Sequence, residues 1–353
     1  MCKRLFLILA SLVMTTLALA VETNATYTLS EALKTKHTLR FKKGKPFRIL
    51  ILSDVQSQGP HVPAPFLENI EKLVSTAEPD LVLFCGDNSV RMKEAEMLKS
   101  YLTDMAGPAE KRKIPWAHVY GNHDDEREGV LSKIAQQEIY ESFPYCVSKR
   151  GDPSIYGVGN YLLPIYASET NSILFAVWGL DSGTYNKLPN NVGYDFIHRD
   201  QIDWYEKTSK ELEENQKRLV PGMMFFHIPL QEFYIYWTCR QQFPHEGEMR
   251  QNFACPTVGC DLGMKIFQRG DIKLIANGHA HNNYGLVEFN GVKFCFVSTP
   301  GNECFYNEDI LGGRLVEIFE DNPFDFKTRM LFINTPVPKN HEHQTKLMIK
   351  KKK

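Results

Sequence analysis

The sequence lacks an excess of charge of either sign and, beyond its first twenty residues, any long apolar run. Its 353 residues include 41 basic and 42 acidic side chains, which gives a formal net charge of -1. This balance, with no basic stripe, argues against stable nucleic-acid binding. The missing apolar run predicts no transmembrane anchor after the N-terminal region. Because 43% of the residues are hydrophobic, the chain can bury a substantial core.

Cysteine is scarce, and its spacing does not suit a metal site. The chain has eight cysteines and no C-x-x-C pair, so cysteine-ligated zinc is a poor fit. Without Cys2, seven cysteines remain; in an oxidising compartment some would pair, and their odd number leaves at least one thiol free. We expect a buried thiol at Cys85 and a local disulfide among Cys239, Cys255 and Cys260.

The N-terminus predicts entry into the secretory pathway. Two basic residues precede a short apolar stretch and the small-residue cleavage site Ala18-Leu19-Ala20, so residues 1–20 are expected to be a signal peptide. An uncleaved anchor is the alternative. Asn24 begins a glycosylation sequon just after the expected cleavage point. We therefore expect a glycoprotein that is secreted or delivered to the endolysosomal system.

The rest of the chain alternates between two kinds of apolar pattern. Runs of branched residues, such as 47–53 and 81–85, predict buried strands, and the helical spacing at 66–77 predicts a helix between them. This alternation predicts an α/β fold with a parallel sheet core. The second half is richer in strands. The expected organisation is an irregular lead-in at 21–46, a single domain at 47–335 and a polar, Lys-rich tail at 336–353.

Five predicted strands end in side chains suited to metal binding or acid-base chemistry. They supply Asp54; Asp87; Asn122, His123 and Asp124; His227; and His279 with His281. Ligands in open α/β sheets gather outside the carboxyl ends of the strands, so these side chains are predicted to converge. Carboxylates, imidazoles and an amide suit zinc, manganese or iron, in more than one ion's worth. Two ions about 3.5–4 Å apart would clamp a phosphate and generate hydroxide from bound water.

Each of these residues also has a plainer explanation when it is taken alone. Asp54 fits a turn, Asp87 or Asn122 fits a helix cap, and His227 fits a hydrogen-bonded core histidine. Five such strand ends in one chain favour the metal site over five unrelated coincidences.

The ordered blocks resemble the calcineurin-like metallophosphoesterase superfamily, whose pattern is Asp-x-His, Gly-Asp, Gly-Asn-His-Asp/Glu, a lone His and Gly-His-x-His. The resemblance implies a four-layer αββα sandwich of two mixed sheets flanked by helices. It implies a first metal on Asp54 and His281, a second on Asn122, His227 and His279, and Asp87 as the bridge. It also implies that His123 is the general acid and that Asp124 orients it.

The first block departs from this pattern, because Gln56 stands where most members have the ligand histidine. A glutamine oxygen is a harder, neutral ligand, so it shifts the preference of the first site away from soft ions. The resemblance therefore implies two divalent or trivalent ions, iron, zinc or manganese, with Gln56 as a candidate ligand of the first.

The narrower resemblance is to the secreted purple-acid-phosphatase-type branch, through residues 178–183, 226–230 and 270–271. It implies a phosphomonoesterase in which metal-bound hydroxide attacks a phosphorylated small molecule or protein. The alternatives are a phosphodiesterase or nuclease on the same site, and a secreted binding protein whose metal site is impaired by Gln56. The sequence does not indicate an oligomeric state.

Overall fold

The computed structural model describes residues 27–334. The predicted signal peptide, Asn24 and the Lys-rich tail lie outside the described residues. Among the residues that are described, no helix has both the length and the apolarity that a bilayer span requires.

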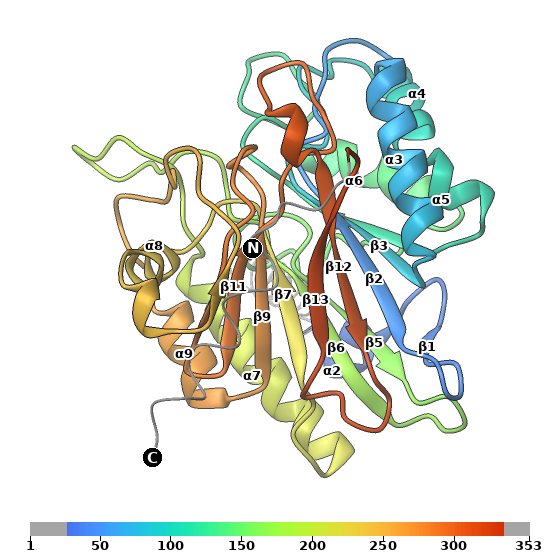
Figure 1. Ribbon diagram of the computed structural model, residues 1–353, viewed down its shortest axis with the longest axis vertical. Helices are drawn as coiled ribbons and strands as arrows, with labels where there is room; N and C mark the ends of the chain where they lie inside the picture. Colours follow the sequence, from blue (N-terminus) through green and yellow to red (C-terminus); the bar gives the residue numbers. More distant parts are fainter. Residues whose placement is uncertain (1–26, 335–353) are drawn as a thin grey trace, which may run out of the picture.

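Two sheets form the centre of the fold (Figure 1). The strand order of the first is β1 (Leu39–Arg40), β5 (Tyr161–Tyr166), β6 (Ile173–Gly179), β7 (Gly222–Phe225), β9 (Ile272–Asn277), β11 (Val292–Phe296), β10 (Leu286–Phe289) and β8 (His245–Glu246). That of the second is β13 (Lys327–Phe332), β12 (Gly312–Ile318), β2 (Phe47–Leu52), β3 (Leu81–Cys85) and β4 (Trp116–Val119).

The strands that precede the predicted site are parallel within each sheet. β2 pairs with β3 and β3 with β4 in the smaller sheet, and β7 pairs with β9 in the larger one. Antiparallel strands complete both sheets, including β12 beside β2 and β5 beside β6. Both sheets are therefore mixed, and each brings the carboxyl ends of its parallel strands to one edge.

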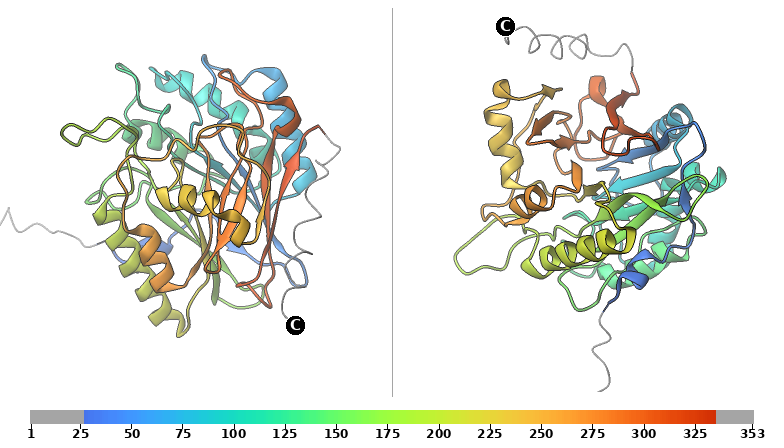
Figure 2. Two further views of the ribbon diagram at one scale, coloured as in Figure 1. Left: turned by 60° about the vertical axis from the view of Figure 1, so that its left-hand side comes forward. Right: turned by 90° about the horizontal axis from the view of Figure 1, so that it is seen from below.

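Helices cover the outer face of each sheet (Figures 1 and 2). On the smaller sheet these are α3 (Ala64–Ala77), α4 (Ala95–Met105), α5 (Gly107–Lys111) and α6 (Lys133–Ser142). On the larger sheet they are α7 (Arg199–Gln216), α8 (Gln231–Thr238) and α9 (Leu262–Arg269). α2 (Leu29–Leu33) lies beside β5 and α7, and two short 3₁₀ helices cover Arg240–Gln242 and Glu308–Ile310.

The core has three apolar layers, which confirms the four-layer sandwich. The middle layer lies between the sheets and joins Ile49 and Leu83 of the smaller sheet to Val177 and Phe225 of the larger one. Alternate residues of the same strands face outward against the helices, as Leu50 and Trp178 do. Strands buried on both faces in this way require the continuous apolar runs that the sequence contains.

Three expectations differ from the structure. The lead-in at 21–46 is not wholly irregular, because it contains α2 and β1. α8 forms in the polar, aromatic insertion, where no helix was predicted. All seven described cysteines are free thiols, so the predicted local disulfide is wrong. The thiol of Cys239 donates to the carbonyl of Ile235 at the end of α8, while Cys260 packs into the core of the larger sheet.

Candidate metal centre

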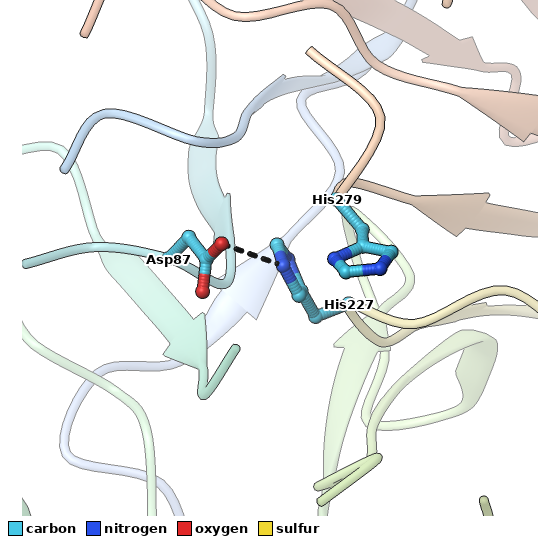
Figure 3. Close-up of side chains that lie close together, drawn as sticks. All are labelled: Asp87, His227 and His279. Atoms are coloured by element: carbon cyan, nitrogen blue, oxygen red, sulfur yellow. Dashed lines mark ion pairs between the residues drawn. The ribbon is translucent and has the colours of Figure 1, made fainter. Parts of the chain in front are cut away.

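The five predicted strand ends meet where the two sheets face each other. Figure 3 shows Asp87, from the end of β3, pointing toward His227 and His279, which follow β7 and β9 of the other sheet. The ligand atoms of these three residues lie within 4.8 Å of one another. Asp54, Asp87 and His281 form a second group within the same limit. Asp87 belongs to both groups, so it occupies the position expected of a bridging ligand.

The backbone at this edge holds three site residues in a strained conformation. Asp54, Asp87 and His279 have positive φ angles of 57°, 49° and 73°, which non-glycine residues rarely adopt. The carboxylate of Asp54 accepts from the backbone N–H of His279 at 3.0 and 3.1 Å, which ties the two sheets together. Strain of this kind clusters at functional sites, where the surrounding structure stabilises it.

Four buried polar atoms of Asp87, Asn122, His227 and His279 face this place. Asn122 Oδ1 and His279 Nε2 have no hydrogen-bond partner among the described residues. Asp87 Oδ2 and His227 Nε2 form an ion pair with each other at 3.0 Å. Buried polar atoms are rarely left unpaired, and carboxylate, amide and imidazole atoms directed at one place can satisfy themselves on a cation. These residues therefore fit a metal ion.

The pKa values of the two histidines of this group shift in opposite directions. The Nδ1–H of His227 is placed to donate to the Cys85 carbonyl at 2.9 Å, which leaves Nε2 facing Asp87. Burial acts to lower the pKa of His227, but the carboxylates of Asp87 and Asp54 outweigh it and raise the pKa to about 9. Burial and the charge of His227 lower the pKa of His279 to about 3, so this ring is neutral and offers a lone pair.

The second group has its own supporting hydrogen bonds. His281 Nδ1 lies 3.0 Å from the carbonyl oxygen of Phe305, and His281 Nε2 lies 3.5 Å from Asp54 Oδ1. A ring that donates one N–H to a backbone carbonyl presents its other nitrogen to a metal. Asp54 and His281 are both buried, so the second group also has the character of a metal site.

Gln56 lies beside the second group, and its amide has a preferred orientation. In the orientation that gives both the oxygen and the nitrogen of the Gln56 amide a suitable partner, the nitrogen donates to the backbone oxygens of Asp54 and Asp87, both at 3.1 Å. The amide oxygen then lies 3.3 Å from His281 Nε2. The side chain is fully buried. Two backbone carbonyls therefore direct a neutral oxygen toward His281.

His123 differs from the other predicted residues because it is not fully buried, with 31% of its side chain exposed. Its backbone N–H donates to Asp87 Oδ1 at 2.8 Å, and its Nε2 lies 3.9 Å from Asp87 Oδ2. Burial acts to lower the pKa of His123, but the charge of Asp87 and the carboxylate of Glu126 raise it. The ring is thus biased toward the protonated form beside the two ligand groups.

The residue that orients His123 is Glu126, not Asp124. Glu126 Oε1 lies 2.7 Å from His123 Nδ1, since a turn after His123 brings the chain back over the ring. Asp124 points the other way, where its carboxylate accepts backbone N–H groups from Gly121, Ser89 and Asn88 at 2.8, 3.0 and 3.1 Å. The predicted role of Asp124 is therefore corrected: it fastens the loop after β4 to the loop after β3.

Replacing Asp124 with alanine is expected to lower the free energy of unfolding by about 2–4 kcal/mol, because three buried N–H groups lose their acceptor. Thermal and urea denaturation measure this change. Glu128→Ala, at an exposed position of the same loop, is the control and should stay within about 0.5 kcal/mol of the wild type. An Asp124→Ala protein as stable as the control contradicts the assigned role.

Glycine permits the close approach of these loops. A Cβ on Gly121 would lie 2.2 Å from Asp87 Oδ1, and a Cβ on Gly86, whose φ is +87°, would lie 2.6 Å from the His227 ring. Only glycine leaves space there for the carboxylate and the imidazole.

Several residues near the site were missed or misjudged from the sequence. Glu126 gave no signal of its own, and Tyr185, Tyr194 and Phe305 lie beside the site although they belong to loops far apart in the chain. Among the aromatic residues of segment 231–257, Phe233 and Trp237 are buried, whereas Tyr234 is 50% exposed. His118 of β4 is buried and stacks on Tyr140, outside both ligand groups.

Comparisons with known proteins agree with this geometry. Residues 47–283 match the sequence model of the family described as calcineurin-like phosphoesterase. Two Arabidopsis thaliana proteins are similar: "Probable inactive purple acid phosphatase 14" is 27% identical over 75% of this chain and 73% of its own length, and "Probable inactive purple acid phosphatase 29" is 30% identical over 64% and 61%. "Phosphatase DCR2" of Saccharomyces cerevisiae is 28% identical over 72% of this chain and 45% of its own. The chain thus spans less than two thirds of the latter two relatives.

Proposed function

Because the chain belongs to the calcineurin-like phosphoesterase family, we propose that it is a metal-dependent phosphatase that hydrolyses phosphomonoesters at a site for two cations. The observation that carries the proposal is the convergence of buried ligand atoms from Asp87, His227 and His279 within 4.8 Å of one another, with His279 Nε2 and the nearby Asn122 Oδ1 left without a partner among the described residues. Such atoms are expensive to bury unless something binds them.

Each ligand group would hold one of the two proposed cations, the first cation in the group that contains His281 and the second in the group that contains His279. Asp54, Gln56 and His281 would hold the first, Asn122, His227 and His279 the second, and Asp87 would serve both. Bound there, two cations would supply Lewis-acid chemistry that neutralises phosphoryl oxygens and lowers the pKa of a water nucleophile. Iron, zinc and manganese all accept such ligands, and the oxygen of Gln56 favours the harder ions at the first position.

The chain's own residues would handle the proton of the leaving group. Glu126 fixes the tautomer and direction of His123 by holding its Nδ1, which leaves Nε2 free on the side of the ligand groups. A protonated His123 could then donate this proton to the departing ester oxygen. Its partial exposure suits contact with a substrate that arrives from solvent, whereas the buried ligands suit a permanent cation.

Two rival functions share this site. A phosphodiesterase or nuclease would use the same residues, and a binding protein would keep the fold without turnover. The yeast relative is named a phosphatase, which favours a monoester as the substrate. The Arabidopsis relatives are named probable inactive phosphatases, which is consistent with the binding protein.

Hydrolysis rates measured in parallel on p-nitrophenyl phosphate and bis(p-nitrophenyl) phosphate distinguish a phosphomonoesterase from a phosphodiesterase or nuclease. We expect kcat/KM to be at least about tenfold higher for the monoester than for the diester. The phosphoryl group of the monoester has more non-bridging oxygens for two cations to bind. Faster hydrolysis of the diester would replace the proposal with its rival.

Gln56 provides a separate prediction about metal selection. Gln56→Ala should weaken binding of the first cation by about tenfold or more, since even indirect support of a ligand is worth that much. Gln56→His should shift the relative affinity from Mn²⁺ toward Zn²⁺. Competition titrations with a chromophoric chelator measure both, and Gln58→Ala, at an exposed glutamine two positions on, is the control. Unchanged affinity in Gln56→Ala would show that Gln56 is not a ligand.

We also propose that the protein acts in the secretory pathway or outside the cell. The proposal depends on the signal peptide expected at residues 1–20 and on the sequon at Asn24. Expression in a eukaryotic host, followed by N-terminal sequencing and glycosidase treatment, tests cleavage after Ala20 and modification of Asn24.

A further inference from the structure

A pair of tyrosines connects the candidate proton donor to the candidate metal ligands. Tyr185 and Tyr194 face each other across an isolated antiparallel bridge, and their rings stack with centroids 5.6 Å apart at 18°. The ring of Tyr194 also meets His279 edge-on, with centroids 4.3 Å apart. The base of the 184–195 loop therefore borders the first ligand group, which contains His279.

Tyr185 is also linked through Glu126 to His123, the candidate general acid. Its hydroxyl donates to Glu126 Oε2 at 3.1 Å, while Glu126 Oε1 binds His123 Nδ1. In spite of this hydrogen bond and the stack on Tyr194, Tyr185 remains 48% exposed. Burial and the charge of Glu126 raise the pKa of its phenol to about 12, so the hydroxyl stays a neutral donor. A held ring with an open surface is a suitable platform for a flat group.

A second exposed ring, that of Phe305, lies beside His281 of the other ligand group. It stacks on His281 with centroids 4.5 Å apart and is 52% exposed, so it borders the other ligand group. In an in-line displacement the leaving group departs on the side of the proton donor, opposite the nucleophile. His123 is linked through Glu126 to Tyr185 and not to Phe305, so a leaving group protonated by His123 would lie on the Tyr185 side of the site.

We propose that Tyr185, supported by Tyr194, is the subsite for an aromatic leaving group, so that flat aryl or heteroaryl phosphate esters are the preferred class of substrate. This inference rests on the proposed phosphatase function. Tyr185 acts here on specificity through its ring, and its hydrogen bond to Glu126 holds that ring in place.

The test compares two primary alkyl esters, benzyl phosphate and propyl phosphate, which differ in the presence of the ring. Tyr185→Ala should lower kcat/KM for benzyl phosphate about five- to tenfold, mostly through KM, and change propyl phosphate by less than about twofold. Tyr185→Phe keeps the ring but loses the hydrogen bond to Glu126, so its loss on benzyl phosphate should be clearly smaller than that of Tyr185→Ala.

Equal losses on both esters in Tyr185→Ala would overturn the subsite, as would a Tyr185→Phe enzyme that loses as much as Tyr185→Ala. Failure of the phosphatase proposal has a different signature, since the wild type would then hydrolyse neither ester. In that case calorimetric binding of benzylphosphonate decides: weaker binding by Tyr185→Ala supports the subsite, and equal binding overturns it.

Discussion

Replacing His123 with alanine is expected to lower kcat for an alkyl phosphate by about 10²- to 10⁴-fold, the range typical of a lost general acid. The loss should be much smaller for p-nitrophenyl phosphate, because nitrophenolate leaves readily without a proton. Metal content should not change, since the ring of His123 is outside both ligand groups. Steady-state kinetics on the two esters, with elemental analysis of the same samples, measures all three quantities.

Glu126→Gln serves as the companion variant. Glu126 raises the pKa of His123, so its neutralisation should lower that pKa. A general acid is active only while protonated, and the alkaline limb of the kcat profile should therefore move to lower pH. Equal losses on both esters in His123→Ala, or an alkaline limb that does not move in Glu126→Gln, would contradict these roles.

Asp87→Asn is expected to have the largest effect of any single substitution, with loss of both cations and a fall in turnover to the background rate. Asp87 is shared by the two ligand groups, and the substitution removes its charge while keeping its shape. Asp80→Asn is the matched control because it lies at the opposite end of β3, where the carboxylate pairs with Lys42. Elemental analysis and activity measurements should show the control loaded and active.

A loaded Asp87→Asn protein would contradict the bridging role even if its activity were low. Loss of a single equivalent would assign Asp87 to one cation only. Circular dichroism distinguishes either result from loss of the fold.

The sequence predicted which strand-end side chains converge because the signal was local. Each ligand follows a buried apolar run, and burial on both faces leaves such runs no other role than strands. Parallel pairing then brings Asp54, Asp87 and Asn122 to the edge of one sheet and His227 and His279 to the edge of the other. That the two edges face each other came from the family resemblance, not from periodicity.

What the sequence did not predict depends on turns and long loops. Asp124 was expected to orient His123 because it is adjacent in sequence, but the turn points its carboxylate back at Gly121 and brings Glu126 to the ring instead. Tyr185 lies about sixty positions from Glu126 in the chain, and no local pattern joins them. α8 was missed although Phe233 and Trp237 have helical spacing, because its aromatic and branched residues have low helix propensity.

The most direct measurement for the central claim is the metal content of the purified, folded wild-type chain, taken together with its rate on a phosphomonoester. The account predicts two equivalents of iron, zinc or manganese per chain, hydrolysis of the ester, and loss of hydrolysis when a chelator removes the metal. A folded chain with one equivalent or none, and no hydrolysis after metals are added back, would contradict it and favour the binding protein with an impaired site.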